Sequence, residues 1–301
     1  MSRILIIKTA ATGDVVRTTT LLHCFKNDQV WWVTARINID VLPTKISCLE
    51  RIIPIEDISS LNYFEDISFD IVLSLDDDKE SIEILDKIKY KDLIGSYRDK
   101  VTNRITYTSN SAHWFDLSLI SHYSKQEADS MKFNGKMSVQ EHLFNMIGEK
   151  FNGEEYLIYE GIKPNPNKNL IGIEARSGAR WPTKRWNGYQ ELALRLEKEG
   201  FNVVFFKQRN NIRDYMKDIS LCSYVICGDT LAMHLALAYK IPVLTIFTCT
   251  SAAEIFDYSR MEKVVSPYLR EAFFKTTYIP KAVESITQKM VWDAFERNIR
   301  L

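Results

Sequence analysis

Short apolar runs alternate with amphipathic segments along the whole chain, which is the pattern of an open α/β sheet. The run Ile4–Ile7 is apolar at every position, as expected of a central parallel strand that is buried on both faces. Val15–Phe25 has the periodicity of a helix, and Val30–Val33 is a second apolar run, so the spacing is that of a βαβ unit. Further strands are predicted at Arg51–Ile55, Ile71–Leu75 and Leu93–Ile94.

Residues 154–169 interrupt this alternation with the most turn-rich stretch of the chain. Gly161, Pro164 and Pro166 fall here among three asparagines, a composition typical of a linker between domains. We therefore predict one Rossmann-like domain over residues 1–160 and a second over residues 161–282.

The strand and helix pattern then restarts and continues to the end of the chain. Strands are predicted at Leu170–Glu174, Asn202–Phe206, Tyr224–Cys227 and Pro242–Phe247, and helices at Asn187–Glu199, Ile212–Leu221 and Leu231–Tyr239. Gly200 follows the first of these helices, as glycine often does at a helix end. A last amphipathic helix is expected at Val283–Arg297.

Composition and charge exclude several classes of protein. The 301 residues suit about two domains, and 39 basic against 39 acidic side chains give a net charge of 39 − 39 = 0, which argues against a nucleic-acid partner. The longest apolar run, Ile241–Thr248, is too short to span a membrane. The apolar stretch at the start of the chain is too short for a signal peptide. Five cysteines without a Cys-x-x-Cys pair predict free thiols, a cytoplasmic protein and no metal site.

The loop that follows the first strand is the first candidate for chemistry, because ligands of open α/β sheets bind beyond the carboxyl ends of the strands. Gly13 would let a ligand approach the backbone there, and the following helix start favours an anion. Asp14 has two interpretations, a helix cap or a general base that faces the ligand. The loop contains neither a dinucleotide fingerprint nor a Walker sequence.

A second loop, residues 176–186, combines four cations with hydroxyl side chains before a predicted helix. Its cations are Arg176, Arg180, Lys184 and Arg185. Together with Ser177 and Thr183 they would suit a diphosphate. The alternative is a solvated basic loop whose two tryptophans, Trp181 and Trp186, serve packing.

Two more loops follow strands in the second half. The backbone amides of Thr230 and Leu231 would point at an anion, and His234 lies one helical turn further on the same face. A single histidine in an apolar helix is more often a core residue, so both roles stay open. The hydroxyl-rich segment Thr248–Ser251 would either contribute to the same site or cap the next helix.

Taken together, these loops resemble glycosyltransferase family 9, the bacterial lipopolysaccharide heptosyltransferases and their relatives. The motifs that carry the resemblance are Ile4–Lys8 with Gly13–Thr19, then Arg180–Trp186, then Gly228–His234. Their order, spacing and strand–loop–helix contexts agree with the family, and they lie in both halves of the chain.

The resemblance implies a GT-B architecture, in which two Rossmann-like domains face each other across a cleft. It also implies that the C-terminal helix, residues 283–301, packs on the first domain. Asp14 occupies the position of the family's base, which would deprotonate an acceptor hydroxyl in an inverting transfer without metal or cofactor. Lys184, Thr230 and the following amides would stabilise the departing diphosphate.

The donor implied by the family is a nucleotide-diphosphate sugar, by default ADP-heptose. The expected donor-binding residues are Gly13, Ser177, Thr183, Lys184, Asp229, Thr230, Leu231, Met233 and His234. The chain departs from the family after the strand ending at Phe206, where relatives have another strand and helix that help to surround the nucleobase. Lys207 and Gln208 stand where relatives tend to have glycine or an acidic residue, so the sequence leaves the base open.

The acceptor is expected to be a glycan or a lipid-linked sugar held by the first domain. Arg17, His113 and Trp114 are its candidate contacts, the last two by stacking on a sugar, although packing in the core is the commoner role. A lipid-linked acceptor would place the protein at the inner face of the cytoplasmic membrane. The alternatives to a transferase are a non-catalytic nucleotide-sugar-binding or scaffolding protein and a nucleotide-sugar epimerase.

Overall fold

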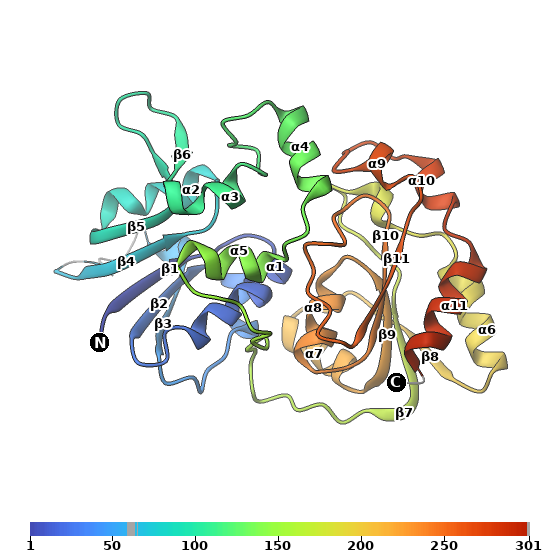
Figure 1. Cartoon of the computed structure of the whole chain (residues 1–301). Coiled ribbons are helices and arrows are strands. Elements are labelled where there is room, and N and C mark those ends of the chain that lie inside the picture. Colours follow the sequence, from blue (N-terminus) through green and yellow to red (C-terminus); the bar gives the residue numbers. More distant parts are fainter. Residues whose placement is uncertain (59–63, 65, 300–301) are drawn as a thin grey trace. The chain divides into compact units, whose positions relative to one another are not determined.

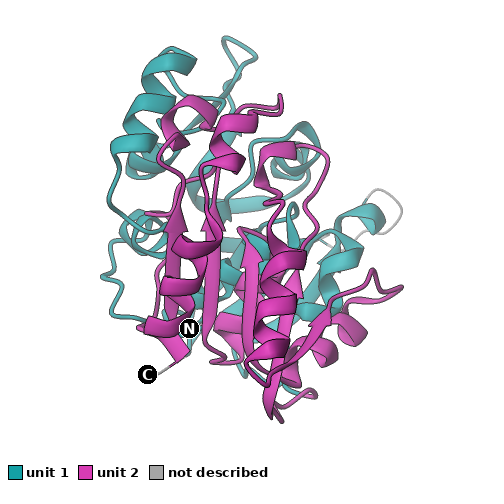
Figure 2. Ribbon diagram, turned by 90° about the vertical axis from the view of Figure 1, so that its right-hand side faces the viewer, with its two compact units in different colours: residues 1–160 teal, residues 161–301 magenta. Residues whose placement is uncertain are grey.

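The computed structural model describes residues 1–58, 64 and 66–299, and the chain divides into two compact units, residues 1–160 and 161–301 (Figures 1 and 2). Each unit is an α/β fold built on its own sheet. No helix in the described parts of the chain has the length and apolar character needed to cross a membrane.

Unit 1 is built on a six-stranded sheet with the order β3-β2-β1-β4-β5-β6. Its strands are β1 Arg3–Ile7, β2 Gln29–Thr34, β3 Leu49–Pro54, β4 Ser68–Ser74, β5 Lys89–Arg98 and β6 Ile105–Tyr107. The pairs from β3 to β5 are parallel, and only the edge pair of β5 and β6 is antiparallel. Residues Ile4–Ile7 of β1 are at most 1% exposed, which explains why this strand is apolar throughout.

The predicted helix at Val15–Phe25 is two shorter elements. The α-helix α1 spans Thr12–Thr18 and continues as a 3₁₀ helix over Thr19–His23. The hydroxyls of Thr18, Thr19 and Thr20 each donate to a backbone carbonyl three or four residues earlier. Such bonds compete with helical geometry and explain the early change of winding.

Unit 1 also contains helices that the sequence analysis did not predict. They are α2 Lys79–Glu83, α3 Ala112–Phe115, α4 Lys125–Asn134, α5 Val139–Met146 and the short 3₁₀ turns Arg36–Val41, Ile55–Asp57, Leu85–Lys87 and Ser109–Ser111. Ser124 and Ser138 begin α4 and α5 with complete capping boxes, to which Glu127 and Glu141 contribute. This Ser-x-x-Glu signal is visible in the sequence.

Unit 2 is built on a five-stranded, fully parallel sheet with the order β11-β10-β9-β7-β8. The strands are β7 Asn167–Glu174, β8 Asn202–Phe205, β9 Cys222–Gly228, β10 Val243–Phe247 and β11 Met261–Val265. The edge strand β11 escaped prediction because Glu262 and Lys263 interrupt its apolar pattern.

The helices of unit 2 cover both faces of this sheet (Figure 1). They are the 3₁₀ turn Pro182–Lys184 and the α-helices α6 Tyr189–Lys198, α7 Ile212–Ser220, α8 Leu231–Ala238, α9 Leu269–Ala272, α10 Pro280–Glu284 and α11 Gln288–Ile299. The predicted last helix at Val283–Arg297 is therefore divided between α10 and α11.

The buried face of α11 packs within unit 2, and the expected contact of residues 283–301 with the first domain stays a prediction. Trp292 and Phe295 belong to the apolar core of unit 2. The Phe295 ring makes edge contacts with the rings of Phe201 and Tyr224, and the Arg195 guanidinium lies 3.7 Å from the centre of a Trp292 ring. The apolar stripe of this helix is thus used to cover the sheet of unit 2.

Candidate functional site

The loop after β1 is held in place by a buried carboxylate from the neighbouring strand. Asp76 follows β4 and is 8% exposed. It accepts hydrogen bonds from the Thr9 amide at 2.5 Å and from the Thr9 hydroxyl at 2.9 Å, and it pairs with the Lys8 ammonium. These contacts fix the backbone where it leaves the sheet.

Asn38 holds the same loop from the other side. Its amide nitrogen donates to the Thr9 carbonyl at 2.7 Å, and its amide oxygen accepts from the Thr12 hydroxyl at 2.7 Å. Ala11, between these two contacts, has a φ of 46°, a left-handed conformation that non-glycine residues rarely adopt. A strained turn persists only where its surroundings enforce it, and Asn38 and Asp76 provide that constraint here.

Asp14 lies in the first turn of α1, and the N-cap position of this helix is Ala11. The interpretation of Asp14 as the cap is therefore wrong. Its carboxylate pairs with Arg17 Nη2 at 2.8 Å, with side chains that are 34% and 13% exposed, respectively. Arg17, expected on the acceptor side, thus lies against the candidate base.

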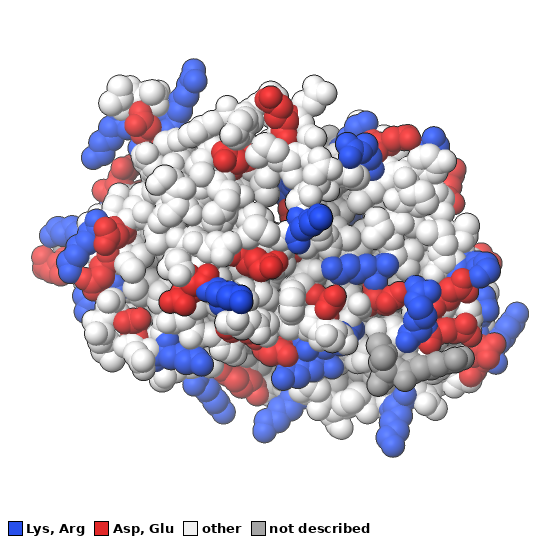
Figure 3. All heavy atoms as spheres, viewed as in Figure 1, with Lys and Arg blue, Asp and Glu red and all other residues white. Residues whose placement is uncertain are grey.

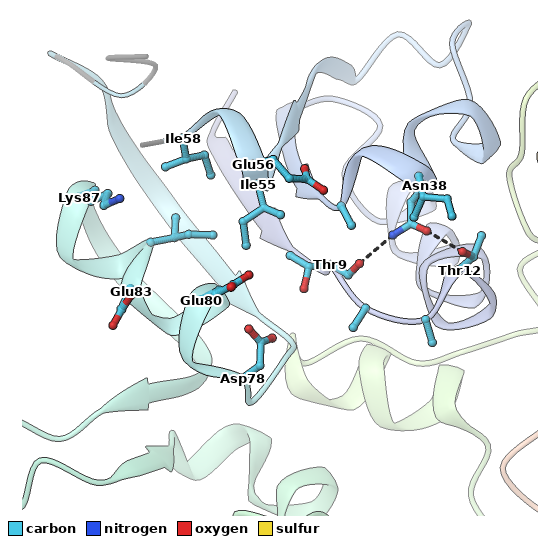
Figure 4. Close-up of a pocket in the computed structure, with 15 residues that line it drawn as sticks. Thr9, Thr12, Asn38, Ile55, Glu56, Ile58, Asp78, Glu80, Glu83 and Lys87 are labelled. Carbon is cyan, nitrogen blue, oxygen red and sulfur yellow. Dashed lines mark hydrogen bonds between the residues drawn. The ribbon is translucent and has the colours of Figure 1, made fainter. Parts of the chain in front are cut away.

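A cavity of about 800 Å³ opens over the carboxyl ends of the first strands of unit 1 (Figure 4). Its wall is formed by the loop Thr9–Thr12, by residues after β2 and β3, and by α2. Four carboxylates line it, those of Glu56, Asp78, Glu80 and Glu83, against the single ammonium of Lys87. The sequence analysis did not identify this cavity, because its residues come from four separate loops.

His113 and Trp114 lie in a different cluster and are not among the residues that line this cavity. His113 Nδ1 is 3.0 Å from Nδ1 of His142, and the Trp114 ring is 5.4 Å from the His142 ring. Burial, followed by the charge of His113, lowers the pKa of His142 to about 4, and burial also lowers the pKa of His113. Both rings are thus neutral at pH 7.

In unit 2, Lys184 and Asp229 meet at the end of β9. Lys184 Nζ is 3.0 Å from Asp229 Oδ2 and donates to the Asp229 carbonyl at 2.9 Å. Burial by itself raises the pKa of Asp229, but the charges of Lys184 and His234 outweigh it, so this pKa lies well below its usual value. At Gly228 a Cβ would lie 3.1 Å from the Lys184 carbonyl, so the absence of a side chain allows the two loops to approach closely.

The start of α8 carries a buried hydroxyl that does not cap the helix. Thr230 is the N-cap, yet its side chain makes no capping bond and its hydroxyl lies against the thiol of Cys227. Leu231 begins the helix, whereas Met233 and His234 are 0% and 4% exposed. The backbone amides of the first turn of α8 are therefore left without a side-chain cap, which suits an anionic ligand.

The cations of the basic loop are largely engaged within the protein. Arg176 forms a two-pronged contact with buried Glu174, Nε to Oε1 at 2.8 Å and Nη2 to Oε2 at 2.6 Å. The Arg180 guanidinium lies 5.1 Å from the Trp181 ring centre. Trp186 is 3% exposed and donates to the Ile286 carbonyl, so this tryptophan has the packing role.

The hydroxyl of Thr183 is engaged within the protein, and the donor-binding role expected for this residue stays a prediction. The side chain is fully buried, donates to the Thr277 carbonyl at 3.3 Å and accepts from the Ile279 amide at 3.0 Å. Ser177 is half-buried beside this loop, and Gly13 lies within α1.

Three residues with clear structural roles escaped the sequence analysis. Asp76 and Asn38 are distant in sequence from the loop they hold, and no local motif marks them. Buried Glu174 accepts from Arg176 and from the Tyr215 hydroxyl at 2.6 Å. One indication of the role of Glu174 was present in the sequence, its position at the end of an apolar strand. A charged side chain is costly to bury there unless it has partners.

Comparisons with known proteins agree with this arrangement. The model of glycosyltransferase family 9 (heptosyltransferase) matches residues 208–278, a segment that includes Gly228–His234. A search among curated proteins gave no match.

Several solved structures have the same fold over nearly the whole chain. A family 9 glycosyltransferase from Veillonella parvula has a TM-score of 0.68 at 16% identity, over 99% of this chain and 97% of that one. Escherichia coli heptosyltransferase WaaC with ADP-2-deoxy-2-fluoro heptose has a TM-score of 0.64 at 14% identity, over 98% and 99%. E. coli ADP-heptose LPS heptosyltransferase II has a TM-score of 0.62 at 14% identity, over 99% and 98%. The resemblance to glycosyltransferase family 9 and the GT-B fold are confirmed.

Proposed function

We propose that this chain is a glycosyltransferase that moves a sugar from a nucleotide-diphosphate donor, held by unit 2, to a glycan acceptor, held by unit 1. The observation that carries this proposal is the Lys184–Asp229 ion pair at the start of α8, of which Asp229 lies within the segment that matches the family model. The solved structures of WaaC with ADP and with an ADP-sugar support the donor class.

In this proposal the donor diphosphate lies over the start of α8. The amides that follow Asp229 point along the helix axis, and the helix dipole favours a negative group there. Lys184 is positioned by Asp229 at 3.0 Å and supplies a fixed positive charge for the leaving group. The Thr230 hydroxyl donates to a phosphate oxygen, and His234 completes the side of the site formed by α8.

Asp14 acts as the general base. Its carboxylate forms an ion pair with Arg17, and its side chain is 34% exposed and so accessible to a substrate. The carboxylate removes the proton of an acceptor hydroxyl, whose oxygen attacks the anomeric carbon. The bond from that carbon to the diphosphate breaks with inversion, and the electron pair leaves on the nucleoside diphosphate.

The family default for the donor is ADP-heptose, and its use in lipopolysaccharide assembly is part of the proposal. One feature favours the non-catalytic alternative. β8 is the edge of the sheet, where the expected further strand and helix of relatives are absent, and Lys207 and Gln208 follow it directly. A donor site with one side shortened would retain binding and lose turnover if the nucleotide were held out of register.

Calorimetric titration with ADP, UDP, GDP and CDP, without added metal, tests the donor site. Selective binding of one nucleotide, weakened in Lys184→Ala and retained in Lys198→Ala on the exposed part of α6, is the expected result. Incubating the protein with the sugar conjugate of that nucleotide and candidate acceptors then tests transfer. Nucleotide binding without acceptor-dependent release of nucleoside diphosphate would favour the non-catalytic protein, and no nucleotide binding would contradict the proposal.

A further inference from the structure

The guanidinium of Arg176 is fixed at the end of β7 by contacts with two neighbouring side chains. Nε and Nη2 donate to the two carboxylate oxygens of Glu174 at 2.8 and 2.6 Å, and Nη1 donates to Oε1 of Gln208 at 3.2 Å. Glu174 also accepts from the Arg176 amide at 2.9 Å and from the Tyr215 hydroxyl at 2.6 Å. The Glu174 side chain is 5% exposed, so a movement of the guanidinium would leave a buried charge without its partner.

The same guanidinium keeps N–H groups that a ligand can use. Each terminal nitrogen of Arg176 carries two hydrogens, and the described residues accept only one from each. The Arg176 side chain is 41% exposed, although its carboxylate partner is buried. The hydrogen bonds to Glu174 also raise the pKa of this guanidinium. Arg176 is therefore a permanent cation that is already held in place, which suits it to bind a phosphate oxygen.

Arg176 lies one strand away from the Lys184–Asp229 pair. The sheet order places β7 between β8 and β9, and Glu174 of β7 is paired with Cys227 of β9. Arg176 and Asp229 each follow these paired residues by two positions, so both leave the sheet at the same level. Neighbouring strands are about 4.8 Å apart, a separation that two linked phosphates can bridge.

A buried hydroxyl without a partner lies at the same strand ends. Tyr189 is 3% exposed, and no described group lies within hydrogen-bond distance of its hydroxyl oxygen. A Cβ at Gly228 would lie 3.8 Å from this oxygen. Burial, and then the charges of Cys227 and Glu174, raise the pKa of the hydroxyl. It therefore lies beneath the ends of β7 and β9, where a water held by a bound ligand would supply the missing partner.

The surface charge of the chain gives such fixed cations their importance. Figure 3 shows lysines and arginines interspersed with aspartates and glutamates over one face, and the chain has 39 residues of each sign. Interspersed charges of opposite sign cancel at a distance, so this face attracts a phosphate only weakly. Phosphate binding then depends on single cations that act at short range.

We infer that Arg176 is a second cation of the donor site, which binds the phosphate next to the nucleoside, while Lys184 binds the phosphate that carries the sugar. The inference rests on the proposed function, because that function requires a nucleoside diphosphate at these strand ends. The bond that breaks is at the phosphate carrying the sugar, so the combined charge of Lys184 and the start of α8 belongs there. Since Arg176 contacts Gln208 beyond β8, the nucleoside lies over β7 and β8.

Nucleoside monophosphates and diphosphates distinguish the two positions, because a monophosphate carries only the phosphate next to the nucleoside. Calorimetric titrations of the full chain would use ADP, UDP, GDP and CDP and the matching monophosphates. For the nucleotide that binds, Arg176→Ala is expected to weaken the diphosphate and the monophosphate about tenfold each. Lys184→Ala should weaken the diphosphate about thirtyfold and change the affinity for the monophosphate less than about twofold.

The chain offers a matched control in Arg209. This residue binds Asp218 through the same two nitrogens, Nε at 2.6 Å and Nη2 at 2.8 Å, and its side chain is 43% exposed. Its partner lies on α7 rather than at a strand end, so Arg209→Ala should leave both affinities unchanged. Arg176→Lys keeps the charge and an ion pair with Glu174 but loses the planar fork, and is expected to weaken both nucleotides about fivefold. This variant also keeps the test valid if Arg176→Ala does not fold.

Several results would overturn the inference while the donor site itself stands. These are unchanged affinities in the Arg176 variants, a loss confined to the diphosphate, an equal loss in Arg209→Ala, and a monophosphate that depends on Lys184 instead of Arg176. If no nucleotide binds to the wild type, the proposed function is rejected and the inference with it.

Discussion

The two units build their candidate sites from the same strand–loop–helix arrangement but distribute charge differently. In unit 1 the segments after the strands carry the carboxylates of Glu56, Asp78, Glu80 and Glu83 around a cavity with one ammonium. In unit 2 the corresponding loops carry cations that are paired within the protein, Arg176 with Glu174 and Lys184 with Asp229. The parallel sheet determines where each site lies, and the paired Lys184 is the group that we propose for the diphosphate of the donor in unit 2.

The largest expected effect concerns Asp14, the carboxylate in unit 1 that we propose as the general base. Asp14→Asn keeps the size of the side chain and removes its basicity, so transfer should fall about a thousandfold, within the usual range for general base catalysis. The measurement is the rate of acceptor-dependent nucleoside diphosphate release. Nucleotide affinity should stay within about twofold, since the donor is held by unit 2. Equal turnover of wild type and variant would show that another group is the base.

The key cation of unit 2 should matter for binding. Lys184→Ala removes a charge-assisted contact to the diphosphate and should weaken nucleotide binding about thirtyfold, measured by calorimetry. It also leaves the Asp229 carboxylate without its partner, so part of the effect is repulsion of the phosphate. The double variant Lys184→Ala/Asp229→Asn should therefore bind more tightly than the single one. An unchanged affinity of Lys184→Ala would place the diphosphate elsewhere.

Acid should affect unit 1 before unit 2, because the buried histidine pair lies in unit 1. The unfolded His142 takes up a proton as the pH falls through about 6.5, whereas the folded one does so near 4. The unfolded form therefore binds more protons between these values, and stability present at pH 7 is lost on acidification, by about 2 kcal/mol at pH 5.

Hydrogen exchange at pH 7 and pH 5, corrected for intrinsic rates, measures this loss in each unit separately. Exchange should accelerate around α3 and α5 of unit 1. The variant His142→Asn should reduce this dependence on pH, and His122→Asn, on an exposed histidine, should retain it. Equal acceleration in both units of the wild type would refute a role for the pair.

A smaller effect is expected from the side chain that holds the loop of the base. Asn38→Ala removes the contacts to the Thr9 carbonyl and the Thr12 hydroxyl, and should lower kcat about tenfold while the nucleotide affinity is retained. Asn210→Ala, at an exposed position, serves as the control. If Asn38→Ala loses stability but keeps a normal kcat, the role of Asn38 is structural only.

Much of the fold could be predicted because buried parallel strands are apolar along their whole length. β1, β9 and β10 were found in this way. β11 was missed because its charged residues lie at a sheet edge. α4 and α5 were missed although the Ser-x-x-Glu sequences of their capping boxes are present. The packing of α11 was inferred from the resemblance, whereas Trp292 and Phe295 contribute to the core of unit 2.

The candidate site was also predicted in part from the sequence. Local motifs located Asp14, Lys184 and Asp229, because each lies in the segment where a strand gives way to a helix. The contacts of Asp76 and Asn38, and the acidic cavity, arise from residues that only the folded sheet brings together. The hydroxyl of Thr183 looked suited to a ligand by composition, but its bonds to residues 277 and 279 show a packing role.

The division of roles between the units can be tested most directly by one hydrogen-exchange measurement on the full chain, with and without ADP. ADP, the nucleotide bound in a similar solved structure, is predicted to protect residues 228–235 and the loop at Lys184. Thr9–Thr12 and α2 of unit 1 are predicted to exchange at the same rate in both samples. Protection of the unit 1 loops by ADP, or no protection by ADP in unit 2, would contradict the account.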